Sequence, residues 1–249
     1  MHKYNPVSMG CLLIAGILLL SGCSQKPSFE KPVVVINRPP VAHRSLTSPQ
    51  SAISVSSASS SRPVSLLIDV PFAPQSPFAV WDKLHEEACE EMSLIMVHHF
   101  LEGTKLSMAD AETEVQAMIA WERDHDYADD VSSSQLGDIA KSLYMYHVRV
   151  LTNVTADTLR TELALGNPII IPAFGRALKN PYFSGAGPFY HMLVVTGYSG
   201  DGFITNDPGT KQGAQYWYSS KVLMNALHDW TGVKEEIATG LKTAVVVEL

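Results

Sequence analysis

The sequence of 249 residues predicts an α+β domain, and three observations support this. Helical hydrophobic patterns come first, between about residues 89 and 146. Strand patterns rich in Val, Ile and Tyr dominate from residue 148 to the end. Two of these strand patterns are joined by the short turn SGD, which favours antiparallel pairing. We therefore expect helices packed on one mainly antiparallel sheet.

The first half of the domain is expected to be mostly helical. SLLIDVPF, residues 65–72, is typical of a short strand, and the proline-containing segment that follows is typical of a loop. A first helix is expected to begin at Cys89. A second helix is expected over residues 107–125, where Ser107 and Asp110 have the spacing of a capping pair. A third helix is expected from Ser134 to about Tyr146.

The second half of the domain is expected to supply most of the sheet. A helix is expected from Thr155, as its N-cap, to a stop at Gly166. A further helix is expected over SSKVLMNALHDW, residues 219–230. Strands are expected over residues 148–153, 168–174, 191–198, 202–208, 216–219 and 243–249.

The N-terminus carries the features of a secretion signal. A segment with one lysine, MHKYNP, precedes an uncharged apolar run over residues 7–20, which is too short for a comfortable membrane span. The run ends in Leu20, Ser21, Gly22 and Cys23, which resemble the lipobox of bacterial lipoproteins. This resemblance implies cleavage after residue 22 and a lipid on Cys23, each buried methylene of which contributes about 0.8 kcal/mol to membrane binding.

Residues 23–64 are expected to form a lipidated tether without regular structure, because they are rich in serine and proline and poor in core-forming residues. Residues 65–249 are then the globular domain. The net charge of −7 argues against a nucleic-acid partner. These features predict an extracytoplasmic protein held on a membrane of the bacterial cell envelope, and its oligomeric state stays open.

Cys89 is the candidate reactive thiol. Cys11 lies in the predicted signal peptide and Cys23 is the predicted lipidation site, so Cys89 has no cysteine with which to form an internal disulfide. An inert buried cysteine is the alternative. Residues 90 and 91 are both glutamate, and we expect them to be solvated first-turn residues at the positive end of the helix dipole, on a different face from the thiol.

A histidine and a carboxylate suitable for activating the thiol follow downstream. His191 begins one strand of the predicted hairpin, and Asp207 ends the other. Positions facing each other across a tight hairpin can lie side by side, and a thiol nucleophile needs a base and a group that orients that base. Strand alternation separates Asp207 from Asn206, but Asn206 remains an alternative orienting group.

Four motifs in this order resemble papain-like cysteine peptidases of the type that cuts bacteriocin leaders after a double glycine, together with their free-standing relatives. They are DVPFAPQ (residues 69–75), ACEEMSLIM (88–96), HMLVVTGY (191–198) and ITNDPG (204–209). The resemblance implies a papain-like fold in which Cys89 is the nucleophile and His191 is the general base and acid. It further implies that Asp207 orients His191, and that the Gln75 side chain and the Cys89 amide bind the oxyanion. In such sites a thiolate–imidazolium pair lowers the thiol pKa from about 8.5 to roughly 3 to 4.

The sequence departs from the family in two places. Many relatives have Gly-Pro where this chain has Glu90 and Glu91, and the segment between Gln75 and Cys89 is longer than in the leader-cutting members. Trp81, Tyr182, Phe183 and Phe189 are aromatic residues that either line a cleft or cover the core.

Three functions remain open at this stage. The chain is a peptidase acting on a peptide or protein substrate, another acyl-transfer enzyme such as a transpeptidase or cell-wall amidase, or a peptide-binding module without turnover. No cofactor is expected. His98, His99 and Glu102 could be read as metal ligands, but a pair without a third convergent ligand favours a structural role, so no metal is expected. The acidic run over residues 122–130 is expected to be solvated.

Overall fold

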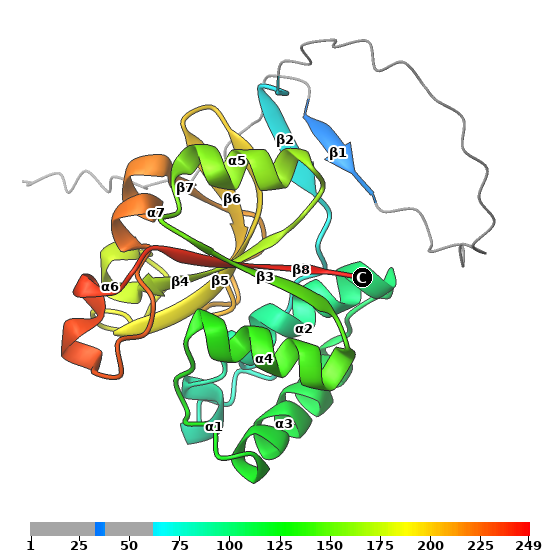
Figure 1. Ribbon diagram of the computed structural model, residues 1–249. Coiled ribbons are helices and arrows are strands. Elements are labelled where there is room, and N and C mark those ends of the chain that lie inside the picture. Colours follow the sequence, from blue (N-terminus) through cyan, green and yellow to red (C-terminus); the bar gives the residue numbers. More distant parts are fainter. Residues whose placement is uncertain (1–32, 38–61) are drawn as a thin grey trace, which may run out of the picture.

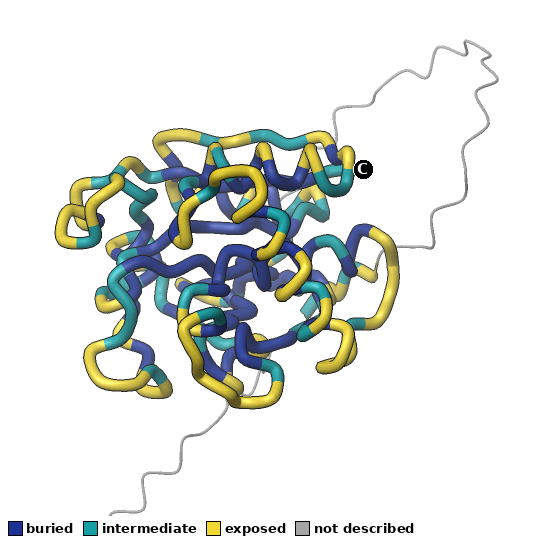
Figure 2. Tube along the Cα trace, turned by 90° about the horizontal axis from the view of Figure 1, so that it is seen from below, coloured by how far each residue is buried: buried dark blue, intermediate teal, exposed yellow. Residues whose placement is uncertain are grey.

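The computed structural model describes residues 33–37 and 62–249. Helices lie on both sides of a single mixed sheet, and buried strands form the centre of the molecule under exposed loops (Figures 1 and 2). The strands are β1 (Val34–Ile36), β2 (Ser65–Ile68), β3 (His147–Thr152), β4 (Ile169–Phe174), β5 (Tyr190–Ser199), β6 (Gly202–Asn206), β7 (Tyr216–Ser219) and β8 (Thr243–Glu248). Every strand pair in this sheet is antiparallel except β1 with β2.

Strand β5 organises the sheet because three other strands pair with it. Its first half pairs with β4, from Tyr190 to Val195, and its end pairs with β2 along the same edge. Strand β6 pairs along the opposite edge, with an irregularity between Val195 and Gly197. The remaining order, β4–β8–β3 on one side and β6–β7 on the other, extends the sheet outward. Nine of the ten residues of β5 are buried, as expected for a central strand.

The helices lie around this sheet. They are α1 (Lys83–Glu86), α2 (Cys89–Glu102), α3 (Met108–Asp124), α4 (Ser133–Tyr144), α5 (Ala156–Ala164), α6 (Gly175–Leu178), α7 (Ser220–Ala226) and the 3₁₀ helix η1 (Lys234–Thr239). In Figure 1, α1 to α4 gather below the sheet and α5 lies above it. Contacts of α2 with β5 hold the N-terminus of α2 against the central strand.

The predicted fold class is confirmed: this is an α+β domain with a mainly antiparallel sheet. The predicted caps are also found, since the Asp110 amide donates to Ser107 Oγ and the Thr158 amide donates to Thr155 Oγ1. Gly166 ends the α5 segment with a φ of 89°, a conformation that glycine adopts without strain. The short helices α1 and α6 were not predicted.

One part of the expected tether has regular structure. Val34–Ile36 forms β1 and pairs in parallel with Leu66, Leu67 and Ile68 of β2, so the prediction of a tether without regular structure is wrong for these residues. Residues 38–61 of that range, and residues 1–32 with the predicted signal peptide and Cys23, lie outside the described residues. Among the helices of residues 62–249, none is long and apolar enough to cross a membrane.

Candidate active site

Cys89 is the first residue of α2, and its side chain reaches β5. Its sulfur accepts a hydrogen bond from the Met192 amide at 3.3 Å, which places the thiol beside the residue that follows His191. The first N–H groups of a helix have no intrahelical acceptor, so the Cys89 amide lies at the positive end of α2. Only 5% of Cys89 is exposed.

His191 and Asp207 form a buried pair. His191 Nε2 lies 2.8 Å from Asp207 Oδ1, and neither residue is more than 1% exposed. Because Nε2 faces Asp207, Nδ1 is the ring nitrogen left for a proton transfer with the thiol or a substrate. The hairpin of β5 and β6 therefore brings these two predicted residues together.

Asp207 also receives hydrogen bonds from outside the hairpin. Tyr218 Oη donates to Oδ2 at 2.6 Å, Asn180 Nδ2 donates to Oδ2 at 3.1 Å, and the Gly209 amide donates to Oδ1 at 3.0 Å. Burial alone would raise the pKa of Asp207, but the charge of His191 and the hydrogen bonds from His191, Tyr218 and the Gly209 amide lower it below its usual value. Asp207 is therefore built to remain a carboxylate.

Asn206 does not orient His191. Its Nδ2 donates to the Val70 carbonyl at 2.9 Å, and its Oδ1 accepts from the Gln215 amide at 3.0 Å. It fixes the segment after β2 and the segment before β7. The alternative left open by the sequence is thus decided by geometry in favour of Asp207.

Gln75 lies on the wall of the same cavity as Cys89 and His191, but its donors point elsewhere. Its Nε2 donates to the His85 carbonyl at 2.8 Å and to the Glu86 carbonyl at 3.1 Å, whereas its Oε1 is buried without a partner. This differs from the prediction of a side-chain donor aimed at an oxyanion. In this arrangement Gln75 fixes the turn of α1 that precedes the nucleophile.

A cavity of about 400 Å³ lies over these residues. Trp81, Tyr182 and Phe183 line it, which confirms the cleft alternative for three of the four aromatic residues. The ring of Phe189 instead stacks under the Arg176 guanidinium, 3.5 Å from its centroid. The three aromatic side chains give the cavity an apolar wall, as is usual for ligand pockets.

Gly209 is a part of the site that the sequence analysis did not single out as functional. A Cβ at this position would lie 2.9 Å from His191 Cε1 and 2.9 Å from a ring carbon of Phe183. The Phe183 ring meets the imidazole edge-on, with 5.4 Å between centroids. The backbone after Asp207 therefore lies against the His191 ring, and only glycine fits there without displacement.

Residues 67–237 match the sequence profile of the Peptidase_C39 like family. The chain belongs to this family. Among solved structures, the chain is similar to a protein from Bacillus anthracis described as a C39-like peptidase, with 14% sequence identity and a TM-score of 0.48 over 73% of this chain and 95% of that one. Comparison with the curated proteins gives no match.

The two glutamates after Cys89 depart from what was predicted for this C39-like site. Glu90 and Glu91 are 1% and 2% exposed, so the expectation that they are solvated is wrong. The Cys89 thiol donates to Glu90 Oε2 at 2.9 Å, and the Val131 amide donates to Glu90 Oε1 at 3.2 Å. The Glu90 side chain therefore folds back over the sulfur, although its Cα lies on another face of the helix.

This contact affects the thiol. Burial, the charge of Glu90 and the hydrogen bond to Glu90 raise the pKa of Cys89, opposite to the lowering that the thiolate–imidazolium pair implies. Burial also raises the pKa of Glu90, to about 8. The ionisation of the Cys89 thiol is thus tied to the ionisation of Glu90.

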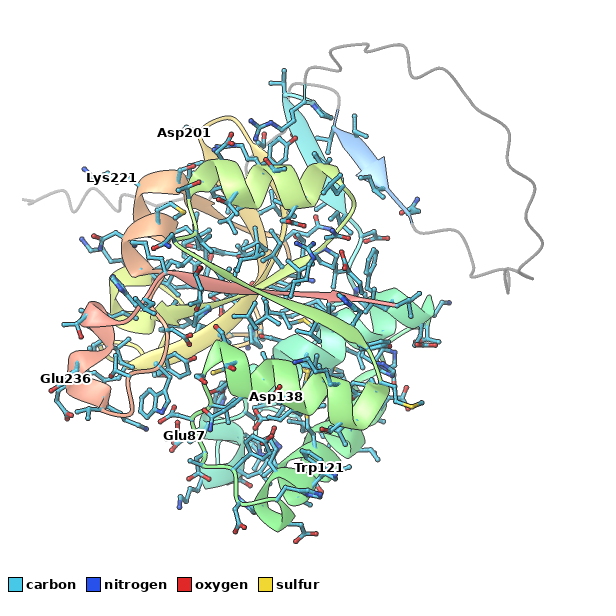
Figure 3. The ribbon with its side chains drawn as sticks, in the orientation of Figure 1. Glu87, Trp121, Asp138, Asp201, Lys221 and Glu236 are labelled. Atoms are coloured by element: carbon cyan, nitrogen blue, oxygen red, sulfur yellow. The ribbon has the colours of Figure 1, made fainter. Side chains whose placement is uncertain are left out.

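Glu91 faces a different partner, Glu122 of α3. Burial and the charge of Glu122 raise the pKa of Glu91, and burial raises the pKa of Glu122. Glu122 is 3% exposed, so this end of the acidic run over residues 122–130 is not solvated as expected. At the other end of the run, Asp130 forms an ion pair with Lys234 of η1, which also pairs with Glu87, labelled in Figure 3.

His98 and His99 have protein partners. His98 Nδ1 lies 2.8 Å from the Tyr146 hydroxyl, which donates to Glu102, and His99 lies between Glu114 and Thr104. These bonds connect α2 to α3 and to the segment before β3. Within residues 33–37 and 62–249, no group of three or more His, Cys, Asp or Glu side chains is arranged to hold a metal ion.

Proposed function

We propose that the protein is a cysteine peptidase that hydrolyses peptide bonds with Cys89, His191 and Asp207. The observation that carries the proposal is that the thiol at the tip of α2 and the histidine on β5 line one cavity, and that the buried carboxylate after β6 is hydrogen-bonded to this histidine. Membership of the Peptidase_C39 like family supports the same class of reaction.

In the proposed reaction, the thiol proton passes to His191 Nδ1 and the thiolate attacks the carbonyl carbon of the substrate. His191 then returns the proton to the leaving amine, and the C–N bond breaks to leave a thioester on Cys89. Water, deprotonated by His191, attacks the thioester, and the released thiolate and imidazolium are restored as the acid product leaves. Asp207 holds the imidazole and stabilises its charge throughout.

The Cys89 amide at the start of α2 is the proposed donor to the oxyanion. Gln75 can be a second donor when it exchanges its 3.1 Å bond to the Glu86 carbonyl for the oxyanion. Its 2.8 Å bond to the His85 carbonyl would keep the amide in place.

The test of the reaction is a peptide library presented to the purified chain with and without added amine acceptors. Hydrolysis that disappears in Cys89→Ala supports the peptidase. Products joined to the amine indicate a transpeptidase. A chain that binds library peptides without releasing product contradicts the proposal and indicates a binding module.

We also propose that the mature chain begins at a lipidated Cys23 and acts outside the cytoplasm on a membrane of the cell envelope. The support is the sequence Leu20–Ser21–Gly22–Cys23 at the end of an apolar run. Cells fed a labelled fatty acid should label the wild-type protein but not Cys23→Ser, which should accumulate as the precursor. An unlabelled wild-type chain contradicts the anchor.

A further inference from the structure

The carboxyl group of Glu90 touches the atom that reacts in the proposed peptidase. Its Oε2 lies 2.9 Å from Cys89 Sγ, closer than the Met192 amide at 3.3 Å. The Val131 amide donates to Glu90 Oε1, and the carbonyl of Val131 accepts from the Tyr190 hydroxyl of β5 at 2.9 Å. The Val131 amide therefore holds the carboxyl group against the sulfur, and the Glu90 residue is 1% exposed.

The direction of the hydrogen bond between Glu90 and Cys89 depends on which group carries the proton. A carboxylate can only accept, so it binds the S–H proton and opposes its transfer to His191. A protonated carboxyl group can donate, and O–H donation to sulfur stabilises a thiolate. The same contact either hinders or supports the nucleophile.

We propose that Glu90 is a further catalytic residue, and that in its protonated form it donates a hydrogen bond to the Cys89 thiolate while His191 carries the thiol proton. This inference rests on the proposed function, because it describes the nucleophile of that reaction. The proton balance is simple: one proton moves from Cys89 Sγ to His191 Nδ1, and Glu90 keeps its own. The thiolate then has two donors, the Glu90 carboxyl and the Met192 amide.

The surroundings of Glu90 favour its neutral form. Burial is the main cause and raises its pKa to about 8, with Asp130 adding to the shift. The titratable groups around it are a thiol, two carboxyl groups and a phenol, namely Cys89 and Glu91 on α2, Asp130 in the segment before α4 and Tyr190 on β5. Lys234 pairs with Asp130 rather than with Glu90, and in the proposed reaction His191 becomes a cation when it takes the thiol proton. Below pH 8 the carboxyl group is thus mostly protonated.

Burial is the largest cause that raises the pKa of Cys89 and is present whatever the state of Glu90, but a neutral Glu90 removes the next two causes. Two of the causes that raise the pKa of Cys89 are the charge of Glu90 and the hydrogen bond to its carboxylate. Protonation of Glu90 removes the charge and reverses the hydrogen bond. Ionisation of Glu90 at higher pH restores both and switches the thiol off.

The test is the rate of Cys89 alkylation by iodoacetamide between pH 5 and 9.5, followed by mass spectrometry of the Cys89 peptide in the full chain. The wild-type rate should fall about tenfold between pH 7 and pH 9, because a group of pKa about 8 is about 90% ionised at pH 9. In Glu90→Gln, which keeps a donor at all pH values, the rate should change less than about twofold over this range. Glu90→Ala, which has neither donor nor charge, should react more slowly than Glu90→Gln at pH 7.

Glu91→Gln is the matched control, because Glu91 is equally buried but faces Glu122 and not the sulfur. In Glu91→Gln the rate of Cys89 alkylation should fall above pH 8 as it does in the wild type. A Glu90→Gln profile that matches the wild type, or a Glu91→Gln profile that loses the fall, would overturn the proposal. If Glu90→Gln does not fold, the carboxyl carbon of Glu90 in the labelled wild-type chain can be titrated by NMR. A midpoint near 8 supports the proposal, and a midpoint near 4.5 overturns it.

This experiment measures the reactivity of the Cys89 thiol and not peptide cleavage. The role of Glu90 and the peptidase activity can therefore be refuted independently. A fall above pH 8 that depends on Glu90, in a protein that cleaves no peptide, supports the role of Glu90 and contradicts the peptidase. Peptide cleavage, together with a pH profile of Cys89 alkylation that is the same in Glu90→Gln and the wild type, supports the peptidase and contradicts the role of Glu90.

Discussion

Asp207 and Glu90 are both buried carboxyl groups, one in contact with His191 and the other with Cys89, yet their surroundings give them opposite tendencies to ionise. Asp207 has an imidazole, a phenol, a side-chain amide and a backbone amide around its two oxygens. Glu90 has one backbone amide and a thiol. The pKa of Asp207 is lowered, and that of Glu90 is raised to about 8. Burial penalises both carboxylates, and the supply of donors and positive charge decides which one stays ionised.

The largest expected loss of turnover follows from removing the charge of Asp207, which has more hydrogen-bond donors than Glu90. Asp207→Asn keeps the shape of the side chain but leaves His191 without a carboxylate to fix its tautomer and charge. Turnover of a cleaved library peptide should fall by roughly a thousandfold or more, as in other catalytic triads.

Asp201→Asn is the control for this change, because Asp201 lies on the exposed turn of the same hairpin and is labelled in Figure 3. It should retain wild-type turnover. An Asp207→Asn variant with more than a tenth of wild-type turnover would mean that Asp207 is not the orienting residue.

A smaller effect is expected from removing one donor to Asp207. Tyr218→Phe deletes the 2.6 Å hydrogen bond to Oδ2, and a hydrogen bond to a charged group contributes about 1.5 to 3 kcal/mol. The pKa of Asp207 should rise, so the activity should be lost at a higher pH on the acid side of the profile. Tyr216→Phe on the same strand is the control. If both variants lose activity at the same pH on the acid side of the profile, Tyr218 does not stabilise the Asp207 carboxylate.

The smallest expected effect is on stability and concerns the buried carboxyl groups with raised pKa values. Glu90, Glu91 and Glu122 have raised pKa values, so the folded chain binds more protons than the unfolded chain above pH 4.3, the usual glutamate pKa. Their contribution to the free energy of unfolding is complete below that pH and is lost as the pH rises through the folded-state values, near 8 for Glu90.

Glu122→Gln should therefore lower the dependence of stability on pH between 5 and 8, measured by urea denaturation at each pH. Glu236→Gln, on the exposed surface of η1, should leave that dependence unchanged. A steeper loss of stability in Glu122→Gln than in the wild type would show that this carboxyl group is ionised in the folded chain.

Much of the fold could be predicted from the sequence because it depends on local signals. The hairpin turn at residues 199–201, the caps at Ser107 and Thr155 and the apolar strands all fix their own segments. The pairing of His191 with Asp207 followed from the same hairpin. The strand β1 depends on its pairing with β2, and no local pattern marked it. The single-turn helix α1 has a local cap, since the Asp82 side chain accepts from the Leu84 and His85 amides, but its segment was expected to be a loop.

The surroundings of the glutamates could not be predicted for the same reason. On a helix, Glu90 points away from the face of Cys89, and only the Val131 amide from the segment before α4 shows why it turns back. Tyr218 and Asn180 reach Asp207 from separate segments, so neither carried a signal of its role. The hydrogen bonds of Gln75 to the His85 and Glu86 carbonyls could not be foreseen, because that segment was expected to be a loop.

The most direct test of the central claim is the reactivity of Cys89 toward iodoacetamide at pH 6 in the wild type and in His191→Ala. At that pH Glu90 is protonated, and we predict that the thiolate–imidazolium pair makes wild-type Cys89 react far faster than a free thiol of pKa about 8.5 would, and that His191→Ala abolishes the difference. A wild-type Cys89 that reacts no faster than His191→Ala at pH 6, and ionises only above pH 8.5, would contradict the account.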